Sequence, residues 1–316
     1  MSRTFPDYLF STTSVKDIHL SLLLDGCCLL RGALQKNTVS QLATKIEAIS
    51  QMKSDQVRRD EKLDTIKRYH INESEFQHAY PNQSLYDVLE DNKLHHLLHS
   101  IFGENQYQPH PETYTRGIDT RKEKNRDLTS FQPLAFHLDT VYHEPTDKFA
   151  INFWVPLEDD CGNSRPGLQV APMDHITIRR IIGFNPQSGF RYSEPTIDES
   201  PWSTENIWKR IIDGNPDCVI WRPTCSMGDV LIMTSWIPHA SYTHNKMKLP
   251  RRSVELRYHG NALDPLPVTI HSLNEVGMSL GSRASYHAFH DHSGNYVRIK
   301  ELRLDGHQKK FWEKFF

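Results

Sequence analysis

Residues 131–159 read FQPLAFHLDTVYHEPTDKFAINFWVPLED, and this stretch decides the fold class. It holds short segments rich in apolar, aromatic and β-branched residues, separated by Pro, Asp and Glu, which is the pattern of β-strands joined by turns. Comparable segments follow at 229–239 (DVLIMTSWIPH) and 251–260 (RRSVELRYHG). Regularly spaced strands with turn signals favour a β-sandwich or barrel over alternating βαβ units.

The N-terminal third of the chain has a different periodicity. Apolar residues recur every three or four positions over about 15–55 and again over 84–103, which predicts helices. Within the first region, the segment 26–32 (GCCLLRG) is a short apolar run bounded by glycines, which indicates a buried strand. We therefore expect a mainly β protein with flanking helices.

Composition excludes several classes of protein. The 316 residues carry 37 Lys+Arg against 39 Asp+Glu, a net charge of −2, so we predict no nucleic-acid partner. The mean hydropathy is −0.60 and no apolar run approaches the ~18–20 residues that span a bilayer, so we predict no membrane insertion. The five cysteines are an odd number and the N-terminus lacks an apolar leader, which together indicate a soluble, cytoplasmic protein.

A candidate metal site lies in the deciding stretch. His137 and Asp139 are two residues apart in a predicted strand, so their side chains share one face. A second histidine, His239, ends the segment 229–239. Two histidines and one carboxylate on a β-fold form the facial triad of non-haem Fe(II) oxygenases, which leaves positions open for a cosubstrate and O₂. We predict that these three residues bind Fe(II).

An arginine-bearing strand supports this interpretation. A guanidinium binds a carboxylate through two parallel hydrogen bonds, which suits the far carboxylate of a dicarboxylate cosubstrate whose other end chelates iron. Such a contact contributes on the order of 1.5–3 kcal/mol. Arg251 and Ser253 share one face of the strand and Arg252 takes the other, so we favour Arg251, with Arg252 as the alternative. Ser253 or Ser241 would add a hydroxyl contact.

The chain resembles the phytanoyl-CoA-dioxygenase-like branch of the Fe(II)/2-oxoglutarate dioxygenases. The resemblance runs from about Asp25 to about His259 and is densest in 136–175 (FHLDTVYHEPTDKFAINFWVPLEDDCGNSRPGLQVAPMDH) and 228–241 (GDVLIMTSWIPHAS). It implies a double-stranded β-helix (jelly-roll, cupin-like) fold and the cofactors Fe(II), 2-oxoglutarate and O₂.

The resemblance also implies roles for individual residues. His137, Asp139 and His239 match the iron ligands, and Arg251 matches the arginine that holds the 5-carboxylate of 2-oxoglutarate, assisted by Ser241. Trp154 matches an aromatic residue that walls the cosubstrate pocket in relatives, although a large aromatic here is equally explained as core.

We therefore expect a single elaborated domain over 1–316. It comprises an N-terminal helical and strand region (1–104), a jelly-roll core (105–260) and a C-terminal extension (261–316). Two stretches, 116–130 and 183–215, have loop composition. Their basic residues would line a mouth for a polar or anionic molecule or are simply solvated.

The predicted activity is hydroxylation of an unactivated C–H bond of a small polar or secondary-metabolite-type substrate, with release of succinate and CO₂. Halogenating relatives replace the carboxylate ligand by a small residue, and this chain retains Asp139. Two alternatives stay open: a cupin-type metalloenzyme that does not use 2-oxoglutarate, and a non-catalytic jelly-roll binding module. Substrate identity and oligomeric state are not predicted by the sequence.

Overall fold

The computed structural model describes residues 5–59, 71–89, 92–103, 106–110, 113–118, 150–173, 218–235, 237–260, 288–290 and 296–298. The helical elements are α1 (Val15–Leu24), α2 (Lys36–Arg59), α3 (Glu73–Ala79), the 3₁₀-helix η2 (Leu85–Leu89) and α4 (Asn92–Phe102). The strands are β1 (Asp7–Leu9), β2 (Cys27–Arg31), β3 (Tyr107–Pro109), β4 (Tyr114–Ile118), β5 (Ala150–Pro156), β6 (Gly167–Val170), β7 (Val230–Thr234), β8 (His239–Tyr242), β9 (Arg251–Gly260), β10 (Ala288–His290) and β11 (Tyr296–Arg298).

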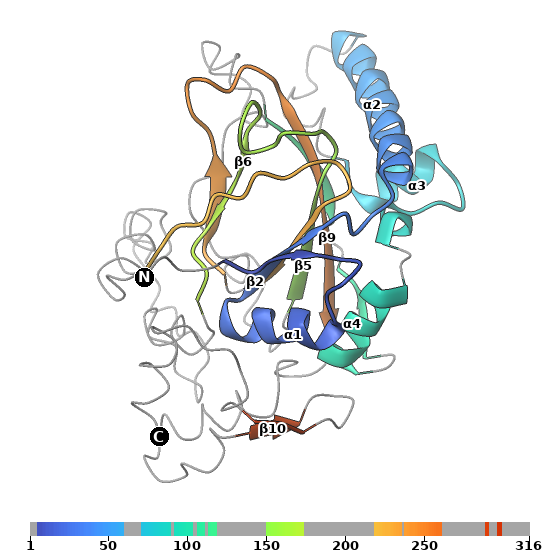
Figure 1. Ribbon diagram of the computed structural model, residues 1–316. Helices are drawn as coiled ribbons and strands as arrows, with labels where there is room; N and C mark the ends of the chain where they lie inside the picture. Colours follow the sequence, from blue (N-terminus) through green and yellow to red (C-terminus); the bar gives the residue numbers. More distant parts are fainter. Residues whose placement is uncertain are drawn as a thin grey trace, which may run out of the picture.

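A seven-stranded sheet forms the larger layer of the fold (Figure 1). Its order is β1-β2-β7-β5-β9-β3, and β4 also pairs with β9. All of these pairings are antiparallel except the parallel pair β1-β2. The strand predicted at 26–32 is β2, and it joins the sheet by pairing with β7. The sheet therefore includes strands from the N-terminal region as well as from 105–260.

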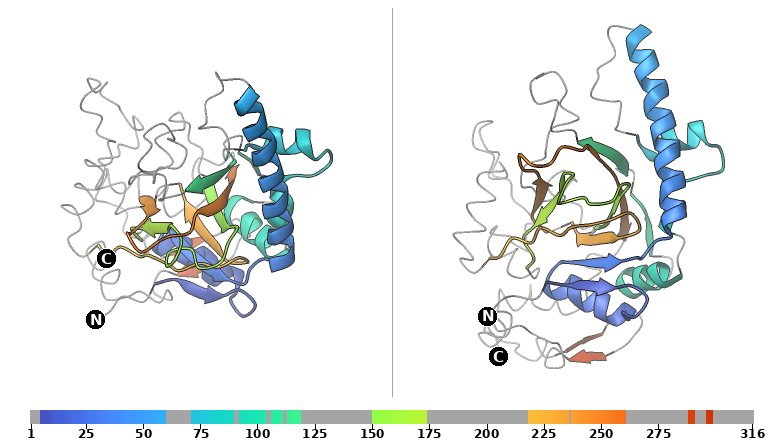
Figure 2. Two further views of the ribbon diagram at one scale, coloured as in Figure 1. Left: turned by 90° about the horizontal axis from the view of Figure 1, so that it is seen from above. Right: turned by 45° about the horizontal axis from the view of Figure 1, so that its top comes forward.

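A second, two-stranded sheet lies opposite the larger one. It pairs β6 with β8 in antiparallel register, so that Val170 lies opposite His239. Figures 1 and 2 show β6 and β8 facing β5 and β9 across the interior of the molecule. A hydrogen bond of 2.9 Å from Arg251 Nη1 to the Gly167 carbonyl joins the two sheets. Two facing antiparallel sheets confirm the predicted double-stranded β-helix class.

The helices cover the outer side of the larger sheet, and the hydrophobic core lies between them. Ile18 and Leu22 of α1 and Leu97 of α4 are fully buried, together with Phe153 of β5 and Leu256 of β9. The long helix α2 runs beside the β9 and β4 edge of the sheet (Figure 2). The N-terminal helices are therefore part of the scaffold that positions the sheet.

Local sequence explains where α1 begins and ends. Ser14 caps its N-terminus by accepting a hydrogen bond of 3.1 Å from the Asp17 amide. Gly26 follows the helix with φ +66°, and a Cβ there would lie 2.0 Å from Ile237 Cδ1. Glycine is required at this position because the backbone is left-handed and the neighbouring side chain fills the space.

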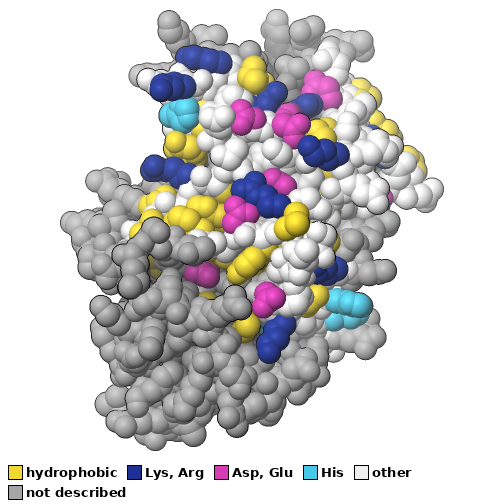
Figure 3. All heavy atoms as spheres, viewed as in Figure 1, with side chains coloured by type: hydrophobic (Ala, Val, Ile, Leu, Met, Phe, Trp, Pro, Cys, Tyr) yellow, Lys and Arg dark blue, Asp and Glu magenta, His cyan; other side chains and the backbone are white. Residues whose placement is uncertain are grey.

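The surface of the described part carries mixed charge. On the face in Figure 3, basic and acidic side chains are interspersed with apolar ones, as the net charge of −2 leads one to expect. Within the described residues, no helix has both the length and the apolar character needed to cross a membrane.

One predicted boundary is wrong, and two predicted segments lie wholly or mostly outside the described residues. Residues 116–118 belong to β4, so the loop predicted over 116–130 does not begin at Arg116. β4 is a strand because it pairs with β9 over Ile118 opposite Arg251 through Tyr114 opposite Glu255. The stretch 183–215 lies outside the described residues, as does the extension 261–316 apart from β10 and β11.

Candidate functional site

The candidate site lies on the inward face of β9. Alternate residues of this strand point inward, toward the β6-β8 sheet, and all five are polar and buried: Arg251, Ser253, Glu255, Arg257 and His259. The residues between them point outward, toward the helices, and include the buried Val254, Leu256 and Tyr258. The strand is thus apolar where it meets the core and polar where it faces the other sheet.

Arg251 is an almost completely buried cation. Its relative exposure is 1%, and Nη1 donates to the Gly167 carbonyl at 2.9 Å. Among the described residues, its Nε has no hydrogen-bond partner and no carboxylate forms an ion pair with it. The pKa of Arg251 is lowered to about 10, mainly by burial and in smaller part by the positive charge of Arg116. A buried guanidinium with these properties is suited to bind an anion.

Arg252, the other candidate, lies on the opposite face. Its Nε contacts Glu158 Oε1 at 2.5 Å, and its Nη1 contacts Glu47 Oε2 of α2 at 2.5 Å. The side chain keeps 26% of its exposure. Two carboxylates therefore already neutralise Arg252 on the helical side of the sheet.

Two further polar atoms lie beside Arg251 on the inner face. Trp154 of β5 is fully buried, and its ring centroid is 5.3 Å from the guanidinium carbon of Arg251. Neither its indole Nε1 nor the hydroxyl of the fully buried Ser253 has a hydrogen-bond partner among the described residues. Together with Arg251 Nε, these are three buried donors without acceptors. Three such groups around one buried cation are an arrangement suited to an anion.

His239 begins β8 and is buried, with a relative exposure of 3%. Its Nδ1 lies 2.9 Å from the Ile237 carbonyl, which can only accept a hydrogen bond. Nδ1 therefore carries the proton in the neutral ring, and the lone pair resides on Nε2. Histidine ligands in metal sites commonly have their second nitrogen fixed in this way.

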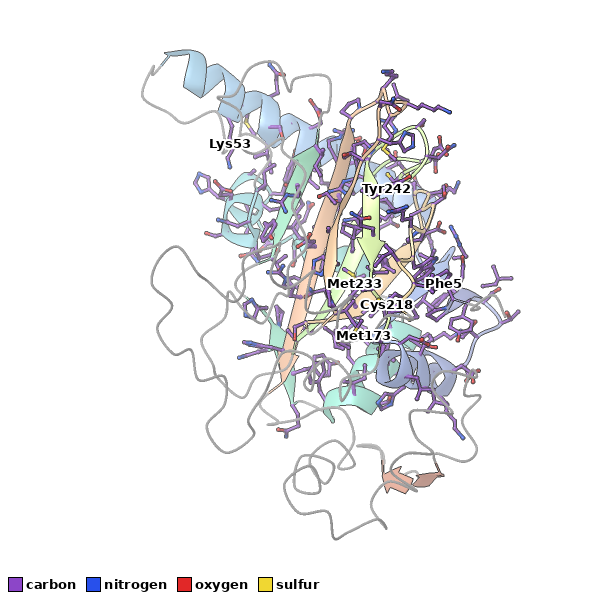
Figure 4. All side chains as sticks on the ribbon, turned by 90° about the vertical axis from the view of Figure 1, so that its left-hand side faces the viewer. Phe5, Lys53, Met173, Cys218, Met233 and Tyr242 are labelled. Carbon is purple, nitrogen blue, oxygen red and sulfur yellow. The ribbon has the colours of Figure 1, made fainter. Side chains whose placement is uncertain are left out.

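Ser241 lies two residues further along β8 and is also buried. Its carbonyl accepts a hydrogen bond of 3.4 Å from Gln169 of β6. Figure 4, viewed from the side of the β6-β8 sheet, labels Tyr242 at the end of β8 and Met233 on β7. His137 and Asp139 lie outside the described residues. Within the part of the chain that is described, no group of three possible metal ligands comes together.

Reasoning from the sequence missed the polar residues further along β9. Glu255 and Arg257 form a buried ion pair of 3.0 Å, and the guanidinium of Arg257 lies 5.3 Å from the ring centroid of Tyr114 on β4. The signal was present in 251–260, where every second residue is polar. In a sheet whose inner face was a packed core, these positions would be apolar.

The family model for phytanoyl-CoA dioxygenase (PhyH) matches residues 22–253, which covers the larger sheet from β2 onward, the β6-β8 sheet and the start of β9. The chain belongs to the PhyH family. The family predicted from the sequence is therefore confirmed, and the predicted cofactors Fe(II), 2-oxoglutarate and O₂ are those of PhyH enzymes. No curated protein matches the chain by sequence.

Several solved structures are similar to this chain. The carbocyclase SnoK from nogalamycin biosynthesis, described as non-haem and α-ketoglutarate dependent, is 11% identical with a TM-score of 0.50, covering 80% of this chain and 87% of SnoK. The epimerase SnoN in complex with Fe³⁺, α-ketoglutarate and nogalamycin RO is 14% identical with a TM-score of 0.48, covering 78% and 83%. AviO1 from Streptomyces viridochromogenes Tue57 is 14% identical with a TM-score of 0.47, covering 79% and 97%. At this identity, the likeness to SnoK shows the fold alone.

Proposed function

We propose that this protein is an Fe(II)/2-oxoglutarate-dependent oxygenase that hydroxylates an unactivated C–H bond of a small polar or secondary-metabolite-type molecule. The observation that carries the proposal is the buried cation Arg251, which has no counter-ion among the described residues. Within the same residues, two further buried donors beside it, Ser253 Oγ and Trp154 Nε1, have no acceptor. Membership of the PhyH family supports the same activity.

Arg251 is the residue that binds the 5-carboxylate of 2-oxoglutarate in this proposal. Removing a charge from water costs several kcal/mol unless a partner compensates, and Arg251 has one neutral carbonyl as its acceptor. A carboxylate would supply the missing charge and an acceptor for Nε, and Ser253 lies on the same face to donate a further hydrogen bond. The ring face of Trp154 would form one wall of the pocket, and its Nε1 would donate a hydrogen bond to the carboxylate. Ser241 is the second candidate hydroxyl.

His137, Asp139 and His239 are the proposed iron ligands. The metal, when bound, activates O₂ with electrons from 2-oxoglutarate, which leaves as succinate and CO₂. The hydrogen bond from Nδ1 to the Ile237 carbonyl holds the His239 ring so that Nε2 is the coordinating atom. Retention of Asp139 as the carboxylate ligand favours hydroxylation over halogenation.

The proposal is tested by adding Fe(II) and 2-oxoglutarate to the protein under anaerobic conditions. Bidentate chelation by 2-oxoglutarate should produce a weak visible charge-transfer band, and admission of O₂ should convert 2-oxoglutarate to succinate. His239→Ala should lose the band. His244→Ala is the matched control, because His244 follows β8 in a partly exposed loop and should leave the band unchanged.

Each of the other outcomes overturns the proposal. A wild-type protein that binds iron without the band or succinate formation would be a metalloenzyme that does not use 2-oxoglutarate. A protein that binds neither iron nor 2-oxoglutarate would be a jelly-roll binding module. If the band persists in His239→Ala, His239 is not an iron ligand.

A further inference from the structure

A second arginine lies beside the proposed 5-carboxylate pocket. Arg116 of β4 pairs directly with Ser253 of β9 in antiparallel register, and Arg251 pairs with Ile118. Residues directly opposite in such a pair point to the same face with Cβ atoms about 4.5–5.5 Å apart, and diagonal neighbours are about 7–8 Å apart. Arg116 therefore points inward, adjacent to Ser253 and diagonal to Arg251, within reach of the same ligand.

The charge of Arg116 has no counter-ion in the part of the chain that the structure describes. No hydrogen bond or ion pair joins it to another described residue, whereas its strand neighbour Tyr114 contacts Arg257. Arg116 is half-buried, and its positive charge acts on the pKa of Arg251, lowering it. Two cations therefore share one region of the inner face.

Ser253 lies directly opposite Arg116 in the strand pair and two residues from Arg251 on the same face of β9. Its hydroxyl is fully buried, and it has no hydrogen-bond partner among the described residues. Arg251 Nε is also buried and also has no hydrogen-bond partner among the described residues. Two guanidinium groups around a free hydroxyl and a free N–H form a site for an anion with several acceptor oxygens, and a carboxylate has this chemistry.

We propose that Arg116 is a second cation of the cosubstrate site and binds the 5-carboxylate of 2-oxoglutarate together with Arg251 and Ser253. This inference rests on the proposed function. It goes beyond it by predicting that both arginines select a dicarboxylate over a 2-oxo acid without the distal carboxylate, and that both retain the product succinate. Arg116 is a binding residue here, and its removal should weaken the ligand without loss of the metal site.

The test measures equilibrium binding by calorimetry, with Mn(II) in place of iron and without turnover. The ligands are 2-oxoglutarate, succinate and 2-oxobutyrate, which has the chelating end of 2-oxoglutarate and no distal carboxylate. We expect Arg116→Gln to lower the affinity for 2-oxoglutarate and for succinate by about tenfold, because one charged hydrogen bond is lost. The affinity for 2-oxobutyrate should be unchanged. Arg116→Lys should retain part of the affinity because it keeps the charge.

Arg222→Gln is the matched control, since Arg222 is an exposed arginine that contacts Gln169 and Tyr242 on the β6-β8 sheet. It should bind all three ligands as the wild type does. The ligand-free unfolding temperature of each variant is measured alongside, and Arg116→Lys provides the comparison if Arg116→Gln folds poorly.

Three results would overturn this inference or the proposed function on which it rests. If Arg116→Gln binds 2-oxoglutarate within twofold of the wild type while Arg251→Gln does not, the second cation is absent and the proposed function stands. Equal weakening of 2-oxoglutarate and 2-oxobutyrate by Arg116→Gln would place its effect away from the distal carboxylate. If neither arginine affects 2-oxoglutarate, the proposed function itself fails.

Discussion

The two faces of β9 differ in what their side chains contact. Outward, Val254 and Leu256 are fully buried against the helical layer, and Arg252 is neutralised by Glu47 and Glu158. Inward, Arg251 and Ser253 are just as buried but have polar atoms without partners in the described residues. Burial alone therefore does not distinguish the stabilising face from the candidate binding face.

The two faces differ in whether their buried polar atoms have hydrogen-bond partners. No outward side chain of β9 has a buried polar atom without a partner among the described residues, which is how a strand contributes to stability. The inward face keeps buried donors unsatisfied, a cost that natural proteins retain where a ligand compensates it. The ion pair between Glu255 and Arg257 marks where the inward face returns to internally compensated charge.

The largest effect is expected from breaking this ion pair. Glu255→Gln leaves Arg257 buried at 3% exposure beside a neutral side chain, and we expect a loss of about 3–5 kcal/mol in the free energy of unfolding. Urea denaturation measures this loss. The double variant Glu255→Leu with Arg257→Met should recover most of it, because no charge stays buried. A loss below about 1 kcal/mol in the single variant would mean that water reaches the pair.

Leu256→Ala tests the outward face. Leu256 is fully buried in the core between the sheet and the helices, so truncation should cost about 2–5 kcal/mol in the free energy of unfolding. The same urea denaturation measures it, and binding of 2-oxoglutarate by the folded variant should be unchanged. A variant of wild-type stability would show that this face is not the main core.

Replacing each of the two neighbouring arginines by glutamine tests which face of β9 binds 2-oxoglutarate. Arg251→Gln should weaken 2-oxoglutarate by about tenfold to a hundredfold, the value of a charge-assisted contact. Arg252→Gln should bind 2-oxoglutarate normally and lose at most about 1 kcal/mol of stability, because its ion pairs are partly exposed. Calorimetric titration with 2-oxoglutarate distinguishes them, and the reverse pattern would mean that Arg252 binds the cosubstrate.

The smallest effect is expected at Ser253. Because its hydroxyl has no partner among the described residues, Ser253→Ala should change the free energy of unfolding by less than about 0.5 kcal/mol. The affinity for 2-oxoglutarate should fall by about threefold to tenfold, through loss of one hydrogen bond. Titration and denaturation of the same sample measure both values. Destabilisation above about 1 kcal/mol would indicate an internal partner for the hydroxyl.

Much of the fold was predictable from local pattern. The glycine-bounded run 26–32 contains β2, and the apolar segments 229–239 and 251–260 contain β7 and β9, the first of them ending at the first residue of β8. These were visible because a strand needs apolar or alternating residues over a short length and turn residues at its ends. The pairing of β2 with β7, about 200 residues apart in the chain, was not, because register depends on the assembled sheet.

The candidate site was predictable in part. The spacing of Arg251 and Ser253 on alternating positions indicated a shared face, and the sheet register agrees with it. Arg116 was interpreted as the start of a loop, because RGIDTRKEKN is rich in charged residues and carries no strand alternation. The contact of β4 with β9 turns this position inward, and that contact is tertiary.

By itself, the sequence determined the strand-rich class, the family and the set of candidate ligands, since these follow from residue types and from spacing along the chain. Only the tertiary structure decided which arginine is buried without a carboxylate and which is neutralised by α2 and Glu158. The physical reason is that the environment of a charge depends on groups brought from distant strands and helices. Arg251 and Arg252 are adjacent in β9 and have the same side chain, but only Arg252 is neutralised by carboxylates of the described residues.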